Sequence, residues 1–293
     1  MPLHIHPSAI VDDSARIGII GAASYVGSAA ADILITGGRA CIGFSRQVRP
    51  ADRHEWRTLA EPAGADRIEN WIDVGPIWTF AERREAMKAY GATKIVITSS
   101  TSRFTKQSSG SKKETETAER LRAGEENFSR WCEANQIDWI ILRPTLIYGL
   151  GRDKNVREIA AMIRKVGMFP IFGAGNGLRQ PIHAADLAMA CVQALDADTQ
   201  NKAYNVSGGQ VLTYRDMVRE VFRALGRRPV TPTVPLPLFK LACRALNLVP
   251  RFAHWTPQMA ERMNADMAFD HSDATADFGF RPRPFRLEPQ DLA

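Results

Sequence analysis

The stretch Ile19-Ile20-Gly21-Ala22-Ala23-Ser24-Tyr25-Val26-Gly27 decides the fold. An apolar strand over residues 16–21 passes through a glycine turn into a helix of small residues over 24–36, which Gly37-Gly38 end. Gly21 permits the tight turn and Gly27 lets the helix pack on the strand, so free N–H groups at the helix start can face two linked phosphates. The turn therefore predicts a dinucleotide site formed by Gly21, Ala23, Ser24, Tyr25, Val26 and Gly27, with a turn that serves packing alone as the alternative.

Strands and helices alternate after this turn. Apolar strands are predicted over 40–45, 71–76, 94–99 and 139–144, helices over 80–90 and 114–135, and a surface loop over 102–113. This alternation favours a parallel sheet that is covered on both faces. Beyond Tyr148 the pattern loosens into helices over 155–166, 184–195, 214–225 and 256–267, with short extended pieces such as 203–206. We predict an arm over 1–15, a doubly wound α/β nucleotide domain over 16–150, and a smaller mixed lobe over 151–293 that interleaves with it near 178–207.

Composition limits the classes of function. The 293 residues are 45% hydrophobic, and 38 basic against 32 acidic residues leave a net charge of +6. The basic residues are scattered, which suits a phosphate-bearing ligand, and no basic groove or aromatic series indicates a nucleic-acid partner. Residues 1–16 lack the apolar core of a secretory signal, and the stretch 234–249 is shorter than the roughly 20 residues that an integral membrane span requires. The four cysteines, Cys41, Cys132, Cys191 and Cys243, lack metal-ligand spacing, so we expect no metal site and reduced thiols in a cytoplasmic protein.

Four further segments follow the glycine turn in a recognisable order. They are Lys94-Ile95-Val96-Ile97-Thr98-Ser99-Ser100-Thr101, Leu142-Arg143-Pro144-Thr145-Leu146-Ile147-Tyr148-Gly149, Arg179-Gln180-Pro181-Ile182-His183-Ala184-Ala185-Asp186 and Tyr204-Asn205-Val206-Ser207-Gly208-Gly209. Together the five motifs resemble the extended short-chain dehydrogenase/reductase superfamily, in particular its NAD-dependent epimerase/dehydratase branch, which acts on nucleotide sugars. The resemblance implies a Rossmann-type fold, a catalytic hydroxyl on Ser100 or Thr101, cofactor contacts from Thr98, Ser99, Pro144 and Thr145, and substrate contacts from Arg143, Arg179 and His183.

The sequence departs from the family pattern at two places. The turn GxxGxxG has Ser24 at its second glycine. The YxxxK pair, in which a lysine lowers the pKa of a catalytic tyrosine, is missing: the tyrosine position holds Thr117 or Ala118, and the lysine position holds Leu121 or Arg122. Arg122 can replace the lysine in holding the cofactor ribose. Candidates for a displaced acid/base are Tyr148, Lys106 and Glu119, with packing or surface roles as the alternatives.

The end of the second strand bears on the choice of cofactor. An acidic side chain there would bind a ribose 2'-hydroxyl, whereas Ser45 followed by Arg46 suits a 2'-phosphate and favours NADP(H) over NAD(H). Residues 46–70 are few for a helix and a full strand, so we expect a trimmed third strand. The adenine pocket is then either open or built from Trp56 and Arg67.

Two classes of function fit these motifs. The first is an NAD(P)-dependent oxidoreductase or epimerase acting on a nucleotide-linked sugar or similar polar carbonyl compound. The second is a non-catalytic NADP(H)-binding redox sensor or assembly factor, which the missing tyrosine favours and the retained Arg143, Arg179 and His183 disfavour. Helices over 80–90 and 114–135 are candidate surfaces for a homodimer, as in the family.

Overall fold

The computed structural model describes residues 16–45, 54–60, 64, 66–107, 110–153, 155–239 and 257–292. The expected N-terminal arm, the side chain of Arg46 and Cys243 lie outside the described residues. The three cysteines that are described, Cys41, Cys132 and Cys191, are free and buried, as expected for reduced thiols. No helix within the described ranges is long and apolar enough to cross a bilayer.

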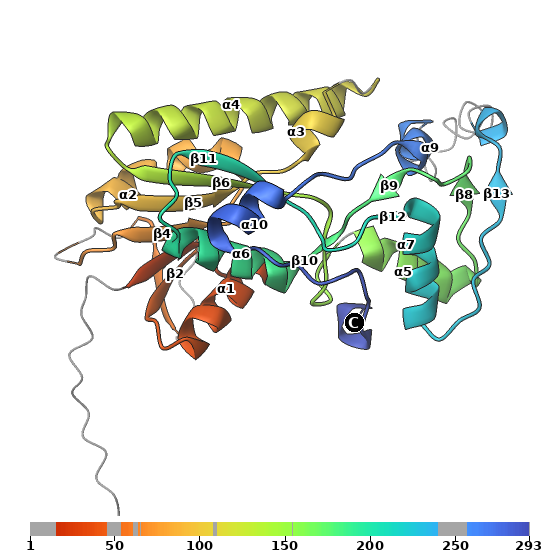
Figure 1. Cartoon of the computed structure of the whole chain (residues 1–293), viewed down its shortest axis with the longest axis horizontal. Coiled ribbons are helices and arrows are strands. Elements are labelled where there is room, and N and C mark those ends of the chain that lie inside the picture. Colours follow the sequence, from red (N-terminus) through yellow and green to blue (C-terminus); the bar gives the residue numbers. More distant parts are fainter. Residues whose placement is uncertain are drawn as a thin grey trace, which may run out of the picture.

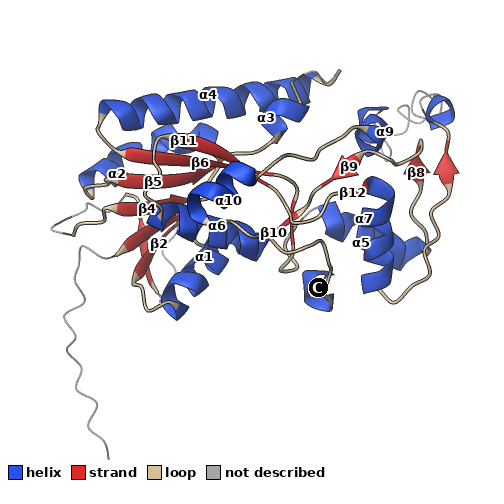
Figure 2. Ribbon diagram, viewed as in Figure 1, coloured by secondary structure: helices blue, strands red, loops and turns tan. Residues whose placement is uncertain are grey.

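A seven-stranded parallel sheet forms the larger part of the molecule (Figures 1 and 2). Its order is β11-β6-β5-β4-β1-β2-β3, so the direction of strand progression reverses between β1 and β4. All neighbours in this sheet pair in parallel. The strands are β1 (Ile17–Ile20), β2 (Cys41–Ser45), β3 (Glu55–Thr58), β4 (Asn70–Asp73), β5 (Lys94–Thr98), β6 (Asp138–Pro144) and β11 (Lys202–Val206). The predicted Rossmann-type sheet is confirmed, with β3 as a short edge strand.

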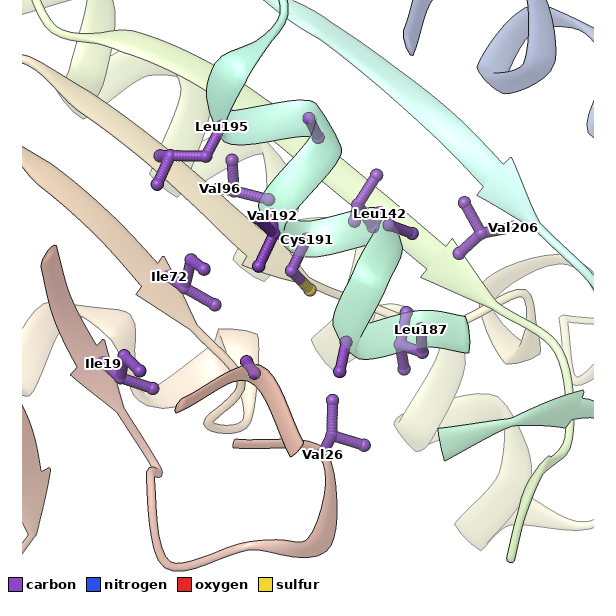
Figure 3. Packing of buried hydrophobic residues seen from close by; sticks show 14 of the residues in the cluster. Ile19, Val26, Ile72, Val96, Leu142, Leu187, Cys191, Val192, Leu195 and Val206 are labelled. Carbon is purple, nitrogen blue, oxygen red and sulfur yellow. The ribbon is translucent and has the colours of Figure 1, made fainter. Parts of the chain in front are cut away.

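Helices cover both faces of the sheet because successive strand residues point to opposite sides. On one face Ile19, Ile72 and Val96 pack with α1 (Tyr25–Thr36) and α6 (Ala184–Asp196), as Figure 3 shows. On the other face Ile20, Trp71 and Ile95 pack with η2 (Ile77–Glu82), α2 (Arg84–Ala89) and α4 (Lys112–Ala134). The polypeptide returns to the first face with α10 (Ser272–Phe278), whose Ala274 joins the same cluster as α6.

The second lobe has its own core beyond the carboxyl end of the sheet (Figure 1). Val156, Ile159 and Ile163 of α5 (Asn155–Val166) pack there against Val218 and Phe222 of α7 (Tyr214–Ala224). Two-residue strands surround these helices. They form the pairs β7 (Ile147–Tyr148) with β10 (Ile182–His183), β9 (Leu178–Arg179) with β12 (Leu212–Thr213), and β8 (Ile171–Phe172) with β13 (Thr233–Val234), next to α9 (Pro257–Asn264) and η4 (Pro289–Leu292).

The piece 203–206 lies in β11 and forms an edge of the central sheet, because its backbone pairs in parallel with β6; it falls within the range 178–207 where the two parts were expected to interleave. Another predicted segment differs from the structure. The expected loop 102–113 contains the short helix α3 (Ser102–Thr105), and α4 already begins at Lys112. The helix propensities of these residues did not predict α3, because its four residues are held by hydrogen bonds from the Arg103 and Phe104 N–H groups to the carbonyls of Ser100 and Thr101.

Candidate functional site

The turn between β1 and α1 needs glycine at two positions. Gly21 has φ +75°, a left-handed conformation, and a Cβ there would lie 3.1 Å from Val74 Cγ2. A Cβ on Gly27 would lie 2.3 Å from the carbonyl oxygen of Gly21. The helix therefore starts in direct contact with the strand end, as the sequence predicted for a phosphate-binding turn.

Ser24, the departure from the glycine pattern, caps α1. Its Oγ accepts a hydrogen bond from the Gly27 N–H at 3.0 Å, and its own N–H donates to the Gly21 carbonyl at 2.8 Å. The N–H groups of Tyr25 and Val26 have no hydrogen-bond partner among the described residues. Two donors at the positive end of the α1 dipole are thus available to an anion.

This turn lies where the strand order reverses, at the carboxyl ends of β1 and β4, which is where open α/β sheets bind their ligands. The predicted cofactor residues Ser45 and Thr98 end β2 and β5 at the same edge. The Thr98 hydroxyl is 3.5 Å from the Asp73 carbonyl oxygen. Available amides, a tight glycine turn and this location fit the diphosphate of a dinucleotide.

A buried ion pair that the sequence interpretation missed supports the edge beside the turn. Asp73, at the end of β4, has no exposed surface and accepts from Arg83 Nε at 2.5 Å and from the Gly75 N–H at 2.9 Å. Arg83 also donates to Thr79 and to the Pro76 carbonyl. An acid that ends an apolar strand was a signal available in the sequence.

The two candidate catalytic hydroxyls have different surroundings. Ser100 is half-buried, and its Oγ accepts from the Ser102 N–H at 3.1 Å, so its own proton is free to be donated. Thr101 is 5% exposed, and its hydroxyl donates to the Pro144 carbonyl at 3.1 Å. The expectation of a catalytic role for Thr101 is corrected to a structural one, because burial separates it from any ligand.

The face of α4 that meets the sheet shows what occupies the place of the missing pair. Thr117 is half-buried, and its hydroxyl donates to the Lys113 carbonyl at 2.7 Å, while Ala118 and Leu121 are buried. Arg122 and Glu119 are exposed. The expected roles of Arg122 at the cofactor ribose and of Glu119 as an acid/base stay predictions.

Tyr148 does not qualify as the displaced acid/base. It has no exposed surface, and its ring packs edge-on against those of His183 and Phe285, with centroids at 5.2 and 4.8 Å. Burial raises the pKa of its phenol far above neutrality. We correct its expected catalytic role to packing.

Lys106 is the third candidate for the acid/base. It follows α3, is half-buried, and has no hydrogen-bond or acidic partner among the described residues. Burial, together with the charges of Arg262 and Lys113, lowers the pKa of its ammonium group. A lysine with a lowered pKa can act as an acid/base nearer to neutral pH.

Arg143, expected at the substrate, belongs to a buried network. Its Nη2 donates to Glu125 at 2.7 Å, Arg103 pairs with the same carboxylate, and Ser99 Oγ donates to it at 2.5 Å. Glu125 is 3% exposed. The network connects α4 to the ends of β5 and β6, and it engages Nε and Nη2 of Arg143 and the hydroxyl of Ser99.

The expected backbone contacts of Pro144 and Thr145 are likewise used within the protein. The Pro144 carbonyl accepts from both the N–H and the hydroxyl of Thr101. The Thr145 N–H donates to Val206 at 3.2 Å, and its hydroxyl donates to the Gln180 carbonyl at 2.5 Å. These bonds join the end of β6 to the segment after β5, to the end of β11 and, through Gln180, to the second lobe.

Arg179 and His183 are also engaged. The guanidinium of Arg179, a residue 4% exposed, donates to the carbonyls of Leu178, Ala265 and Arg262. His183 caps α6 by accepting the Ala185 N–H on Nδ1 at 3.1 Å, and its Nε2 lies 3.2 Å from Asp291 Oδ1. Neither side chain is left available for a substrate, so both expectations are corrected to structural roles.

Trp56 and Arg67 do not form an adenine pocket. Trp56 packs against the α1 side of the sheet, in contact with the His54 ring at 4.6 Å between centroids. Arg67 precedes β4, pairs with Glu69 at 2.9 Å, and therefore lies at the amino end of the strands, opposite the glycine turn. Of the two alternatives left by the sequence, this excludes the pocket built from these two residues.

Known proteins agree with this architecture. Residues 84–207 match the model of the NAD dependent epimerase/dehydratase family. The solved UDP-glucose 4-epimerase of Thermotoga maritima, in complex with UDP-glucose, superposes with a TM-score of 0.67 at 16% identity, over 94% of this chain and 96% of that one. The resemblance inferred from the motifs is confirmed: the chain is similar to the NAD dependent epimerase/dehydratase family over residues 84–207, and it shares the fold of the solved epimerase.

Four curated proteins match parts of this chain by sequence. An uncharacterised protein of Sinorhizobium fredii is 27% identical over 164 residues, which are 55% of this chain and 40% of that protein. Subunit 9 of the 1 alpha subcomplex of mitochondrial NADH dehydrogenase from Arabidopsis thaliana is 28% identical over 102 residues, 34% of this chain and 25% of that protein. The matched segments span a quarter to a half of the length of the curated relatives.

Proposed function

We propose that the chain binds NADP(H) and acts as an oxidoreductase or epimerase on a nucleotide-linked sugar or a similar polar carbonyl or alcohol. One observation carries the proposal: two N–H groups at the start of α1, on Tyr25 and Val26, lie at the reversal point of a parallel sheet and have no acceptor in the part of the chain that the structure describes. This is the arrangement by which such sheets bind a dinucleotide diphosphate. The family whose model matches residues 84–207 is NAD dependent.

In this proposal the residues around the turn have separate roles in the reaction. A bound nicotinamide would supply the hydride. The Ser100 hydroxyl, which keeps its proton free, donates to the substrate oxygen, and Lys106 with its lowered pKa is the candidate that exchanges the proton. The buried Glu125 network and the Asp73–Arg83 pair keep the strand ends rigid beneath them.

The preference for NADP(H) rests on Arg46 next to Ser45 in the sequence. Titration of the protein with NADPH and with NADH, followed by nucleotide fluorescence, tests it. We expect tighter NADPH binding, and Arg46→Ala should equalise the two affinities. Equal affinity in the unchanged protein would remove the role of Arg46, and binding of neither nucleotide would remove the proposed function.

The nucleotide-linked substrate is supported by the structural similarity to an epimerase solved with UDP-glucose. Thermal shift with UDP-, GDP- and dTDP-sugars tests it, and stabilisation by at least one is expected. A substrate found in this way allows the catalytic test. Ser100→Ala should lower kcat by at least tenfold, because one positioned donor contributes about that much or more.

A second candidate is a non-catalytic NADP(H)-binding sensor or assembly factor. The loss of the tyrosine favours it, since Thr117 or Ala118 stands at the tyrosine position and Leu121 or Arg122 at the lysine position. The subunit name of the Arabidopsis relative also supports it. Tight NADPH binding without stabilisation by any nucleotide sugar would favour this candidate. A homodimer through α2 and α4 and a cytoplasmic location complete the proposal, and gel filtration with light scattering tests the former.

A further inference from the structure

A loop of the second lobe reaches the glycine turn. Arg152 follows Gly149-Leu150-Gly151, and its Nη2 donates to the carbonyl oxygen of Ala23 at 2.9 Å. Ala23 lies inside the turn, two residues before Tyr25 and three before Val26, whose N–H groups are unpaired. A cation from the second lobe therefore lies beside the positive end of α1.

The backbone that carries Arg152 is fixed on both sides. The Leu150 N–H donates to Asp291 Oδ1 at 3.1 Å, and Asp153 Oδ1 accepts the Val156 N–H at 2.7 Å at the start of α5. Gly149, with φ +101°, lies so close to the His183 ring that a Cβ there would be 2.4 Å from Nε2. The backbone on both sides of Arg152 is thus held in place beside the turn.

The guanidinium keeps donors to spare. Arg152 is exposed, and no carboxylate of the described residues pairs with it. Its bond to Ala23 uses one of five N–H donors, so the rest of the fork is free for an anion. Among the residues that the structure describes, the cation has no paired carboxylate and the two amides have no acceptor, and this combination is suited to a phosphate.

Ser24 reduces the number of hydrogen-bond donors in the turn that are available to a ligand. Because Ser24 Oγ takes up the Gly27 N–H, one donor at the start of α1 is withdrawn from any ligand. We propose that Arg152 binds the linked phosphates of the dinucleotide and supplies the charged donor that joins the Tyr25 and Val26 amides. The inference rests on the proposed function, since it assigns a further residue to the same nucleotide site.

The test compares Arg152→Gln with Arg120→Gln, a matched loss of one positive charge on the exposed side of α4. We expect Arg152→Gln to weaken the binding of NADPH and of NADH by the same factor, about tenfold, because charge-assisted hydrogen bonds to phosphate contribute on that scale. The affinity for ADP-ribose, measured by calorimetry, should fall by the same factor. The affinities of Arg152→Lys should lie between those of Arg152→Gln and the unchanged protein, and Arg120→Gln should bind all three ligands like the unchanged protein.

Each outcome separates the inference from the proposed function. If the unchanged protein binds neither nucleotide, the proposed function fails. If it binds both and Arg152→Gln binds equally well, the inference is overturned while the proposed function stands. A loss confined to NADPH would place Arg152 at the 2'-phosphate and also overturn the inference. Should Arg152→Gln lower the melting temperature, Arg152→Lys decides: a partial loss of ADP-ribose binding by a well-folded Arg152→Lys protein supports the inference, and no loss contradicts it.

Discussion

The start of α1 and the polar side chains of the second lobe were both expected to bind ligand, yet they differ in what their donors do. At the turn, the Tyr25 and Val26 amides have no partner among the described residues. In the second lobe, Arg179 donates to three carbonyls and both ring nitrogens of His183 are engaged. The direction of backbone N–H donors is set by the conformation of the turn, which glycine allows. A long side chain, in contrast, can form hydrogen bonds with any acceptor that the fold brings close to it.

The strongest test of the turn's support is the buried pair behind it. Arg83→Met leaves the Asp73 carboxylate buried without a countercharge, so we expect the free energy of unfolding to fall by about 3–5 kcal/mol. Urea denaturation measures this. The double variant Asp73→Asn/Arg83→Met should recover a large part, and an equal loss in both variants would contradict the pair as the cause.

The Arg143 network tests whether polar side chains that were expected to bind ligand instead stabilise the fold. Glu125→Gln removes the negative charge that both Arg103 and Arg143 contact, and we expect a loss of about 3 kcal/mol in the free energy of unfolding. Glu126→Gln, an exposed neighbour on α4, is the control and should stay within about 0.5 kcal/mol. A stable Glu125→Gln protein would return Arg143 to the list of substrate residues.

The glycine turn itself predicts a smaller loss. Gly27→Ala places a methyl group 2.3 Å from the Gly21 carbonyl, so stability should fall by about 1–3 kcal/mol and NADPH affinity with it. Gly37→Ala, where the nearest atom would be 3.3 Å away, should be the milder change in both measurements. Thermal unfolding and NADPH titration report the two effects, and an unaltered NADPH affinity in Gly27→Ala would speak against the turn as the nucleotide site.

Acid sensitivity should show the smallest effect. Burial acts to raise the pKa of Asp291, but hydrogen bonds from His183 and from the Glu288 and Leu150 amides lower it on balance. A carboxyl with a lowered pKa stabilises the fold above its unfolded pKa, near 3.9, and loses this contribution as the pH falls through the folded value. The melting temperatures of the unchanged protein and of Asp291→Asn should therefore converge below about pH 4. A parallel offset at all pH values, or the same convergence in the exposed Asp273→Asn, would contradict this role.

The sheet and the turn were predictable because both follow from local patterns. Apolar runs of strand length fixed β1, β2, β5 and β6 to within a residue or two, and glycine spacing fixed the start of α1. The third strand was expected to be short from the number of residues alone, and β3 has four. Such features depend on neighbours in the chain, which the sequence displays.

The partners of long side chains were not predictable in the same way. Arg179 meets carbonyls of residues 262 and 265, more than eighty positions away, and Tyr148 is buried by Phe285 from the final segment. The family resemblance supplied positions for these residues, but their partners come from the packing of the second lobe. Lys106 differs from these residues because it is half-buried near Arg262 and Lys113, which lowers the pKa of its ammonium group, and its role as an acid/base stays a prediction.

Because the polypeptide crosses several times between the sheet domain and the second lobe, these two bodies are not easily separated. The chain passes between them after β6, before α6, after β11 and on both sides of α10, and the final segment places Phe285 and Leu292 in the core of the second lobe. A single proteolytic cut in any one of these connections leaves both bodies joined through the others. Truncation at residue 150 would remove α6 and β11 from the sheet, so an isolated nucleotide domain cannot be obtained by shortening the gene. It requires a gene in which discontinuous segments of the chain are joined.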